Sequence, residues 1–155
     1  IARQAGADDI LIYPRELEGK DAIRALSAEI KNQCGGEGVD VVYDSLGGGY
    51  SEAALRAMAR YGRLLVIGFV AGIPKVPTNL ILLKSCQLVG VSYGGFTQKD
   101  AMGHLDICKA LIGLYQQKII RPHITAHFPL ERGGEAIAML ETRKAIGKIV
   151  VDVQN

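Results

Sequence analysis

Hydrophobic positions along the first part of the chain alternate between two kinds of pattern. Short apolar runs, which are typical of strands, occupy residues 8–13, 39–45, 63–69 and 87–93. Helical spacing of Ile23, Leu26 and Ile30 predicts a helix over residues 20–33. A second helix is predicted over residues 51–62, with Ser51 as its N-cap and Gly62 as its stop. This alternation predicts an α/β fold with a parallel sheet and helices on its faces.

The remaining segments are less regular. Residues 1–7 are typical of the last turns of a helix that stops at Gly6, so the chain is expected to begin inside an element. The run "LILLKS" fits either a strand or a helix by periodicity, and we interpret it as a short helix. The later part predicts a helix, an extended segment, a helix and a closing strand, over residues 100–119, 121–130, 131–144 and 147–153.

The composition of the chain argues against several classes of function. The chain has 155 residues, 48% of them hydrophobic and 22% charged, and its net charge of +2 is too small to favour a nucleic-acid partner. No apolar run reaches the roughly 20 residues that span a membrane, and the start has no signal-peptide pattern. Three widely spaced cysteines, Cys34, Cys86 and Cys108, predict neither disulfides nor a metal site, and they fit a reducing cytoplasm.

Glycines gather where the predicted strands end. The stretch "VVYDSLGGG" ends a strand in three glycines, and glycines also follow the strands near Gly68 and Gly94. Two interpretations stay open: the glycines form turns, or they let the backbone approach a flat ligand at the carboxyl edge of the sheet. No phosphate-binding motif of the GxGxxG or GxxxxGK[ST] type occurs in the chain. Asp44 is predicted to be a structural group that caps the turn after its strand.

Five stretches in order carry a family resemblance: "AGADDILIY", "VDVVYDSLGG", "GRLLVIGF", "QLVGVSYGG" and "RKAIGKIVVDV". They resemble the C-terminal part of the quinone oxidoreductase branch of the medium-chain dehydrogenases/reductases, which is zinc-free and zeta-crystallin-like. The resemblance implies an incomplete Rossmann-type doubly wound parallel sheet over residues 1–121. It further implies that residues 122–155 are the segment that returns to complete a catalytic domain absent from this chain.

The same resemblance implies cofactor contacts, residue by residue. Tyr13 matches a position near the adenosine half of NADPH, and Ser45, Leu46 and Gly48 match the loop at the ribose and adenine side. Gly68, Phe69 and Val70 match the backbone beside the nicotinamide. Gly90 and Val91 match contacts from the next strand, and Arg143 matches a basic residue near the cofactor. The resemblance implies no catalytic acid or base and no metal ligand in this part.

Two functions follow as hypotheses. The first is the C-terminal part of an NADPH-dependent oxidoreductase that transfers a hydride to a quinone or a conjugated carbonyl, inactive without its other half. The second is a non-catalytic α/β module without significant cofactor affinity that dimerises through the strand at 87–93, which relatives pair across a dimer axis. The family strand order 3-2-1-4-5-6 leaves the strand at 8–13 without its neighbours. Three outcomes stay open. The strand at 8–13 can move beside the next strand, a second copy of the chain can supply the missing neighbours, or the chain is part of a longer protein.

Overall fold

A three-stranded parallel sheet forms the centre of the first part of the chain. The computed structural model describes residues 1–142 and 144–153, which divide into compact units at Gly94 and Gly95. In the first unit β1 (Val39–Asp44), β2 (Met58–Val66) and β3 (Gln87–Gly90) pair in the order β1-β2-β3, and both pairings are parallel. The predicted α/β class with a parallel sheet is therefore confirmed.

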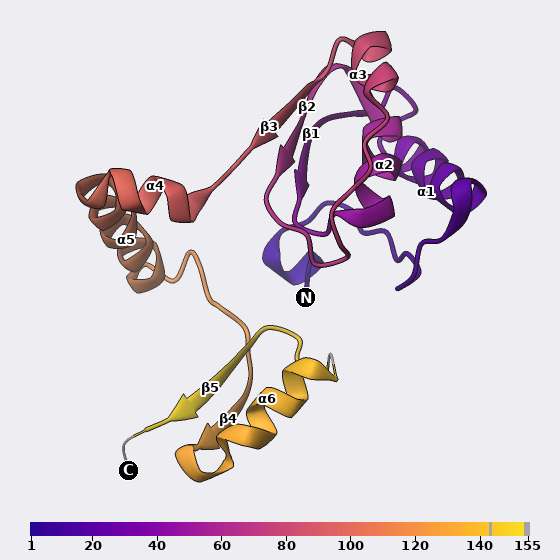
Figure 1. Ribbon diagram of the computed structural model, residues 1–155. Coiled ribbons are helices and arrows are strands. Elements are labelled where there is room, and N and C mark those ends of the chain that lie inside the picture. Colours follow the sequence, from indigo (N-terminus) through magenta and orange to yellow (C-terminus); the bar gives the residue numbers. More distant parts are fainter. Residues whose placement is uncertain (143, 154–155) are drawn as a thin grey trace. The chain divides into compact units, whose positions relative to one another are not determined.

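The helices of this unit lie on one side of the sheet. They are α1 (Gly19–Gln33), α2 (Gly48–Ala57) and α3 (Thr78–Lys84), and Figure 1 shows all three on the same side of β1, β2 and β3. The short helix predicted from "LILLKS" is confirmed as α3. The core between sheet and helices consists of Leu55, Met58, Leu64 and Cys86, with Val42 and Leu88 packed against it. Because Val42, Leu64 and Leu88 are register partners, one face of the sheet is the buried one.

The boundary between α2 and β2 differs from the prediction. The helix begins three residues before Ser51 and ends at Ala57, and the strand begins at Met58 instead of residue 63. Met58 is 1% exposed and belongs to the core, so the chain becomes extended there. The residues up to Gly62 form a bulge against β1, with Tyr61 at φ 63°. Gly62 does not stop the helix; it lies where a Cβ atom would press on the carbonyl oxygens of Val39 and Asp40.

The strand predicted over residues 8–13 does not form. Only a 3-10 turn, η1 (Arg3–Ala5), precedes it, with Gly6 in the left-handed conformation that ends the turn as expected. Residues 7–18 form neither helix nor strand, and Ile12 is 90% exposed. A strand needs a neighbour for its backbone groups, and no described segment pairs with this one. The sequence of this segment fits a strand, but no strand forms because the segment has no pairing partner among the described residues.

The second unit has its own small sheet. Its helices and strands are α5 (Ala101–Gln116), β4 (Ile124–Pro129), η2 (Leu130–Arg132), α6 (Gly133–Glu141) and β5 (Lys148–Asp152), and α4 (Tyr93–Lys99) precedes them. β4 and β5 pair in parallel, and α6 packs on both. The strand predicted at 87–93 stops at Gly90, because Tyr93 already begins α4. Among the described residues, no helix is long and apolar enough to cross a membrane.

A lysine side chain joins α3 to the end of α2. Lys84 Nζ donates to the carbonyl oxygens of Arg56, at 2.7 Å, and of Met58, at 2.5 Å. These carbonyls lie at the C-terminal end of α2, where helix carbonyls lack intrahelical partners and the helix dipole favours a cation. Burial lowers the pKa of the Lys84 ammonium below 10.5, and the neighbouring charge of Lys31 lowers it further. Lys84 therefore fixes the point where α2 ends and β2 starts.

We expect Lys84→Met to lower the free energy of unfolding by about 1–3 kcal/mol, because two carbonyl groups lose their donor. The exposed Lys75 supplies the control, and Lys75→Met should change stability by about 0.5 kcal/mol or less. Urea unfolding followed by circular dichroism measures both. Equal effects of the two substitutions would show that Lys84 does not stabilise the junction.

The lowered pKa of Lys84 also predicts a pH dependence. Between the folded-state pKa and 10.5, the unfolded chain binds a proton at Lys84 that the folded chain does not. Stability contributed by this side chain therefore rises as the pH rises through that window. The difference in unfolding free energy between the native chain and Lys84→Met should grow with pH toward 10.5, because other titrating groups cancel in the comparison. A difference that shrinks with pH would contradict the assignment.

Candidate nucleotide-binding site

The carboxylate of Asp44 organises the turn that follows β1. Its Oδ1 accepts hydrogen bonds from the backbone N–H groups of Leu46 and Gly47, both at 3.0 Å, and its Oδ2 accepts one from Ser51 Oγ. Asp44 is 7% exposed and Ser51 is 2% exposed. The predicted structural role of Asp44 is thus confirmed. Ser51, expected as an N-cap, lies inside α2 and instead serves as the third donor to this carboxylate.

The loops after β1 and β2 dock on each other through their backbones. Ala71 N donates to Leu46 O and Gly48 N donates to Gly72 O, both at 2.7 Å. A Cβ atom at Gly47 would meet Gly72 O, and one at Gly48 would meet Ala71 O. Both glycines also have positive φ, of 76° and 54°. These two glycines are therefore required for loop-to-loop contact, which supports the turn interpretation at this position.

A cleft opens at the carboxyl ends of all three strands. This strand-end cleft has a volume of about 870 Å³. Its lining residues are Tyr43, Val66, Ile67, Phe69, Gly90, Val91, Ser92, Tyr93 and Gly94. The carboxyl edge of a parallel sheet is where open α/β folds bind ligands. Three predicted cofactor contacts, Phe69, Gly90 and Val91, meet here although they come from two different strands.

A second cleft lies between β1, the helices α1 and α2, and the extended segment that precedes α1. This β1-edge cleft has a volume of about 500 Å³ and is bounded by residues 9–13, α1, β1 and the start of α2. Three more predicted contacts, Tyr13, Ser45 and Leu46, line it. Tyr13 packs on Tyr50 with ring centroids 5.3 Å apart, and Tyr50 donates its hydroxyl to Pro14 O at 2.8 Å.

The predicted residues therefore fall into two neighbouring clefts and the loop junction between them. Gly48 and Gly68 are in the junction, where a Cβ at Gly68 would lie 3.2 Å from Ser45 O, and Val70 is exposed on the same loop. Arg143 lies outside the residues that the structure describes. Whether any of these residues touches a cofactor stays a prediction.

Sequence reasoning missed Tyr43, which lines both clefts. Its ring is on the face of the sheet opposite to the buried Asp44 side chain, as the alternation along a strand requires, and it is 70% exposed. That alternation was the available signal. Ser92 and Tyr93 were missed because the strand is predicted to continue through residue 93, whereas β3 stops at Gly90. Gly94, one of the glycines singled out at the strand ends, does line the strand-end cleft.

Comparison with known proteins places the chain in a family. A family profile described as zinc-binding dehydrogenase matches residues 5–151. The chain belongs to the zinc-binding dehydrogenase family. It is 32% identical over 155 residues to quinone oxidoreductase-like protein 2 of Bos taurus, an alignment that covers 99% of this chain and 42% of that protein. A homologue of the same protein in Nematostella vectensis is 30% identical and is covered to 40% of its length. The chain thus spans about two fifths of the length of these relatives.

Solved structures of oxidoreductases share the fold of this chain. A probable oxidoreductase from Mycobacterium abscessus superposes with a TM-score of 0.75 at 31% identity, covering 97% of this chain and 42% of that one. The mycobacterial protein Rv1454c, solved in complex with NADPH, superposes with a TM-score of 0.77 at 26% identity, covering 97% and 45%. The resemblance to the C-terminal part of quinone oxidoreductases and the Rossmann-like fold are confirmed.

The family description raises the question of zinc. Zinc sites in proteins use three or four ligands from cysteine, histidine and acidic side chains. Among residues 1–142 and 144–153 there is no group of three or more such side chains that could hold a metal ion. The donor set of the described residues therefore does not fit zinc.

In this zinc-binding dehydrogenase domain, Gly47 and Gly35 make a matched pair of test positions. Their φ angles are 76° and 77°, but a Cβ at Gly35 meets nothing within 4 Å. We expect Gly47→Ala to destabilise the fold by about 2 kcal/mol more than Gly35→Ala, because its Cβ collides with Gly72 O and because the ψ of −151° at Gly47 is a conformation that is essentially confined to glycine. Thermal or urea unfolding of both variants measures the difference. Equal losses would mean that the two loops can separate without cost.

Removal of the Asp44 carboxylate should be more harmful than removal of its exposed neighbour Asp40. Asp44→Ala leaves two backbone N–H groups and the Ser51 hydroxyl without their acceptor, so we expect a loss of about 3 kcal/mol. Asp40→Ala should cost about 0.5 kcal/mol or less. Unfolding curves of the two variants provide the measurement, and similar stabilities would refute the role of Asp44.

Proposed function

We propose that the chain is the C-terminal part of an NADPH-dependent oxidoreductase that transfers a hydride to a quinone or a conjugated carbonyl. The observation that carries this proposal is the strand-end cleft, where Phe69, Gly90 and Val91 meet at the carboxyl ends of parallel strands. Membership of a dehydrogenase family and the likeness to an NADPH-complexed structure support the choice of cofactor. Quinone oxidoreductase-like relatives support the substrate class.

The cleft suits the nicotinamide half of the cofactor. Phe69 is 50% exposed at its edge, and Gly90 leaves the floor without a side chain. When bound, NADPH supplies the hydride, so this part of the protein needs no acid or base of its own. The residues of the cleft hold the ring in place by apolar contact and keep water from its reactive face.

The other half of the cofactor needs groups that the chain does not supply. No glycine-rich phosphate turn occurs in the sequence. Tyr13, Ser45, Leu46 and Gly48 are proposed to contact the adenosine side, and Arg143 is proposed to lie near the cofactor. Hydride transfer by this part alone is therefore not expected. The proposed enzyme is cytoplasmic and works without zinc.

The proposal also assigns the two ends of the chain to different domains. Residues 1–121 belong to the nucleotide-binding domain, and residues 122–155 to the segment that completes the catalytic domain. In this assignment β4 and β5 are strands of the catalytic domain.

A second function is favoured by one observation. β3 is an edge strand, since the sheet order ends with it. Unpaired backbone groups on an edge strand can pair with another chain. The alternative is therefore a non-catalytic module that forms a homodimer through residues 87–93 and has no significant affinity for the cofactor.

Kinetics of the longer protein test the first function. With a panel of benzoquinones, naphthoquinones and enones, we expect NADPH consumption followed by the loss of absorbance at the nicotinamide band. Gly90→Val should raise KM for NADPH about tenfold, because the added side chain enters the cleft. Gly113→Val is the control, because a Cβ there also meets nothing within 4 Å and the residue is outside the cleft. Absence of turnover across the panel would reject the proposed substrates.

Cofactor titration of the 155-residue chain distinguishes the two functions. Micromolar binding of NADPH, seen as a change in nicotinamide fluorescence, would contradict the module without cofactor affinity. Light scattering over a range of concentrations tests the homodimer in the same samples. If the 155-residue chain and the longer protein both form dimers and neither binds NADPH, the alternative would be favoured.

A further inference from the structure

A surface pocket lies where α5 ends and the segment before β4 begins. This α5-end pocket has a volume of about 500 Å³, and its lining residues are Tyr115, Gln116, Lys118, Arg121 and Pro122. All of them lie between residues 115 and 122, so the local path of the chain is enough to build the pocket. It shares no lining residue with the strand-end cleft or the β1-edge cleft.

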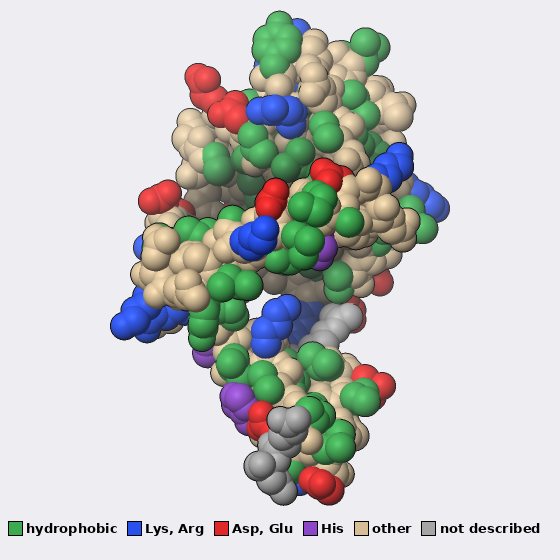
Figure 2. Space-filling view, turned by 90° about the vertical axis from the view of Figure 1, so that its left-hand side faces the viewer, with side chains coloured by type: hydrophobic (Ala, Val, Ile, Leu, Met, Phe, Trp, Pro, Cys, Tyr) green, Lys and Arg blue, Asp and Glu red, His purple; other side chains and the backbone are tan. Residues whose placement is uncertain are grey.

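The lining of the α5-end pocket carries positive charge only. Lys118 and Arg121 are cations, and Tyr115 and Gln116 add a hydroxyl and an amide that can donate hydrogen bonds. The sequence has no Asp or Glu from residue 107 to residue 130. Figure 2 shows side chains of both charges on the visible surface, so a pocket lined by one sign of charge is a local feature. Its donors and charges suit an anion.

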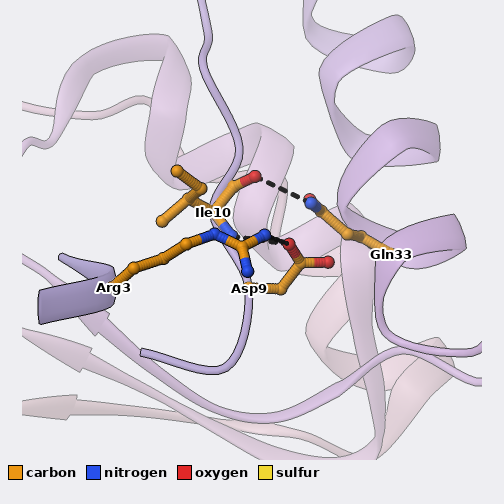
Figure 3. Close-up of polar contacts among 4 residues, drawn as sticks. All are labelled: Arg3, Asp9, Ile10 and Gln33. Carbon is orange, nitrogen blue, oxygen red and sulfur yellow. Dashed lines mark hydrogen bonds and ion pairs between the residues drawn. The ribbon is translucent and has the colours of Figure 1, made fainter. Parts of the chain in front are cut away.

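The two cations of the pocket have no acidic partner among the described residues. Other exposed cations do: Arg3 forms an ion pair with Asp9 at 3.0 Å, as Figure 3 shows. On α5 itself, Lys109 pairs with Asp106 at 3.4 Å. In the part of the chain that the structure describes, the pocket cations also make no side-chain hydrogen bond. Their charges are therefore available to a ligand.

The end of α5 does not need these side chains as caps. Lysine and arginine near a helix C-terminus often donate to its last carbonyl groups. Here backbone groups do so, because Ile119 N donates to Leu114 O at 3.0 Å and Lys118 N donates to Tyr115 O at 2.9 Å. These two bonds form a Schellman motif, which satisfies the carbonyl groups by itself.

Lys118 occupies the position in this motif that glycine usually takes. Its φ is 63°, in the left-handed region that costs a residue with a Cβ atom more than it costs glycine. The side chain placed there at this cost lines the pocket. Backbone strain at a residue that carries a charged group is a recurrent feature of binding sites.

We propose that the α5-end pocket binds a phosphate dianion carried by a small molecule. The guanidinium of Arg121 can form two parallel hydrogen bonds with a phosphate, and the ammonium of Lys118 can bind a further oxygen. A dianion engages both charges, whereas a carboxylate has one charge to offer. The volume is in the range of about 300–1,000 Å³ that is typical of sites for whole small molecules. Tyr115, which is 60% exposed, is available to contact the rest of the ligand.

Nuclear magnetic resonance titration of the 155-residue chain tests the proposal with three probes. Phenyl phosphate should shift the amide signals of residues 115–122 with a Kd of about 1 mM or lower. Inorganic phosphate should shift the same signals with a Kd several times higher, because it makes no contact with the ring of Tyr115. Benzoate, which has the ring but a single negative charge, should bind at least about tenfold more weakly than phenyl phosphate. This inference depends neither on the proposed reaction nor on the cofactor.

Substitutions of the cations sharpen the test. Arg121→Gln should weaken the binding of phenyl phosphate about tenfold, because a charge-assisted pair of hydrogen bonds is lost. Lys118→Gly should also weaken binding, although glycine suits the left-handed backbone and should not destabilise the fold. Lys109→Met is the control, because Lys109 already pairs with Asp106 and does not line the pocket. It should change the Kd by less than about twofold.

The same variants extend the test to the longer protein. Saturation transfer from that protein to phenyl phosphate should be weakened by Arg121→Gln and unchanged by Lys109→Met. Equal effects of the two variants would overturn the proposal, since they would indicate general attraction to surface charge. Benzoate that binds as tightly as phenyl phosphate would also overturn it, because the pocket would not select a dianion. Inorganic phosphate that binds as tightly as phenyl phosphate would contradict the assignment of a larger ligand.

Discussion

The buried carboxylate of Asp44 is the interaction on which the rest of this structure depends. It accepts three hydrogen bonds at the point where β1 ends, and so it sets the path of the loop that leads into α2. Because that loop then bonds to the loop after β2, the two strand ends are held side by side. The strand-end cleft exists because this arrangement keeps bulky side chains out of the junction, where Gly47 and Gly48 contact backbone directly.

Much of this fold follows from the sequence, and the failures have physical causes. Helical spacing located α1, and the apolar runs located β1 and the C-terminal end of β2. The start of β2 could not be predicted from local sequence. It depends on the packing of Met58 in the core and on the hydrogen bond that Lys84 of α3 donates to the carbonyl oxygen of Met58. The strand expected at residues 8–13 has the right sequence but no described neighbour, and pairing is a property of the whole sheet that no local pattern contains.

The candidate site was predictable in outline through the family resemblance and through the glycines at strand ends. Phe69, Gly90 and Val91 meet in one cleft, as their places at neighbouring strand ends require. Tyr13, Ser45 and Leu46, which the resemblance assigns to the adenosine and ribose side, line a separate one. The glycines of "VVYDSLGGG" fit the turn interpretation, because two of them allow the loops to touch. The cleft in which we propose that the nicotinamide binds is formed beside that contact.

A crystal structure of the longer protein with NADPH bound is the most direct test of the central claim that the strand-end cleft holds the nicotinamide. The account predicts that the nicotinamide ring contacts Phe69 and Gly90 within about 4 Å, with the phosphates bound by residues outside this chain. A nicotinamide bound away from the ends of β2 and β3, with the strand-end cleft filled by protein, would contradict it.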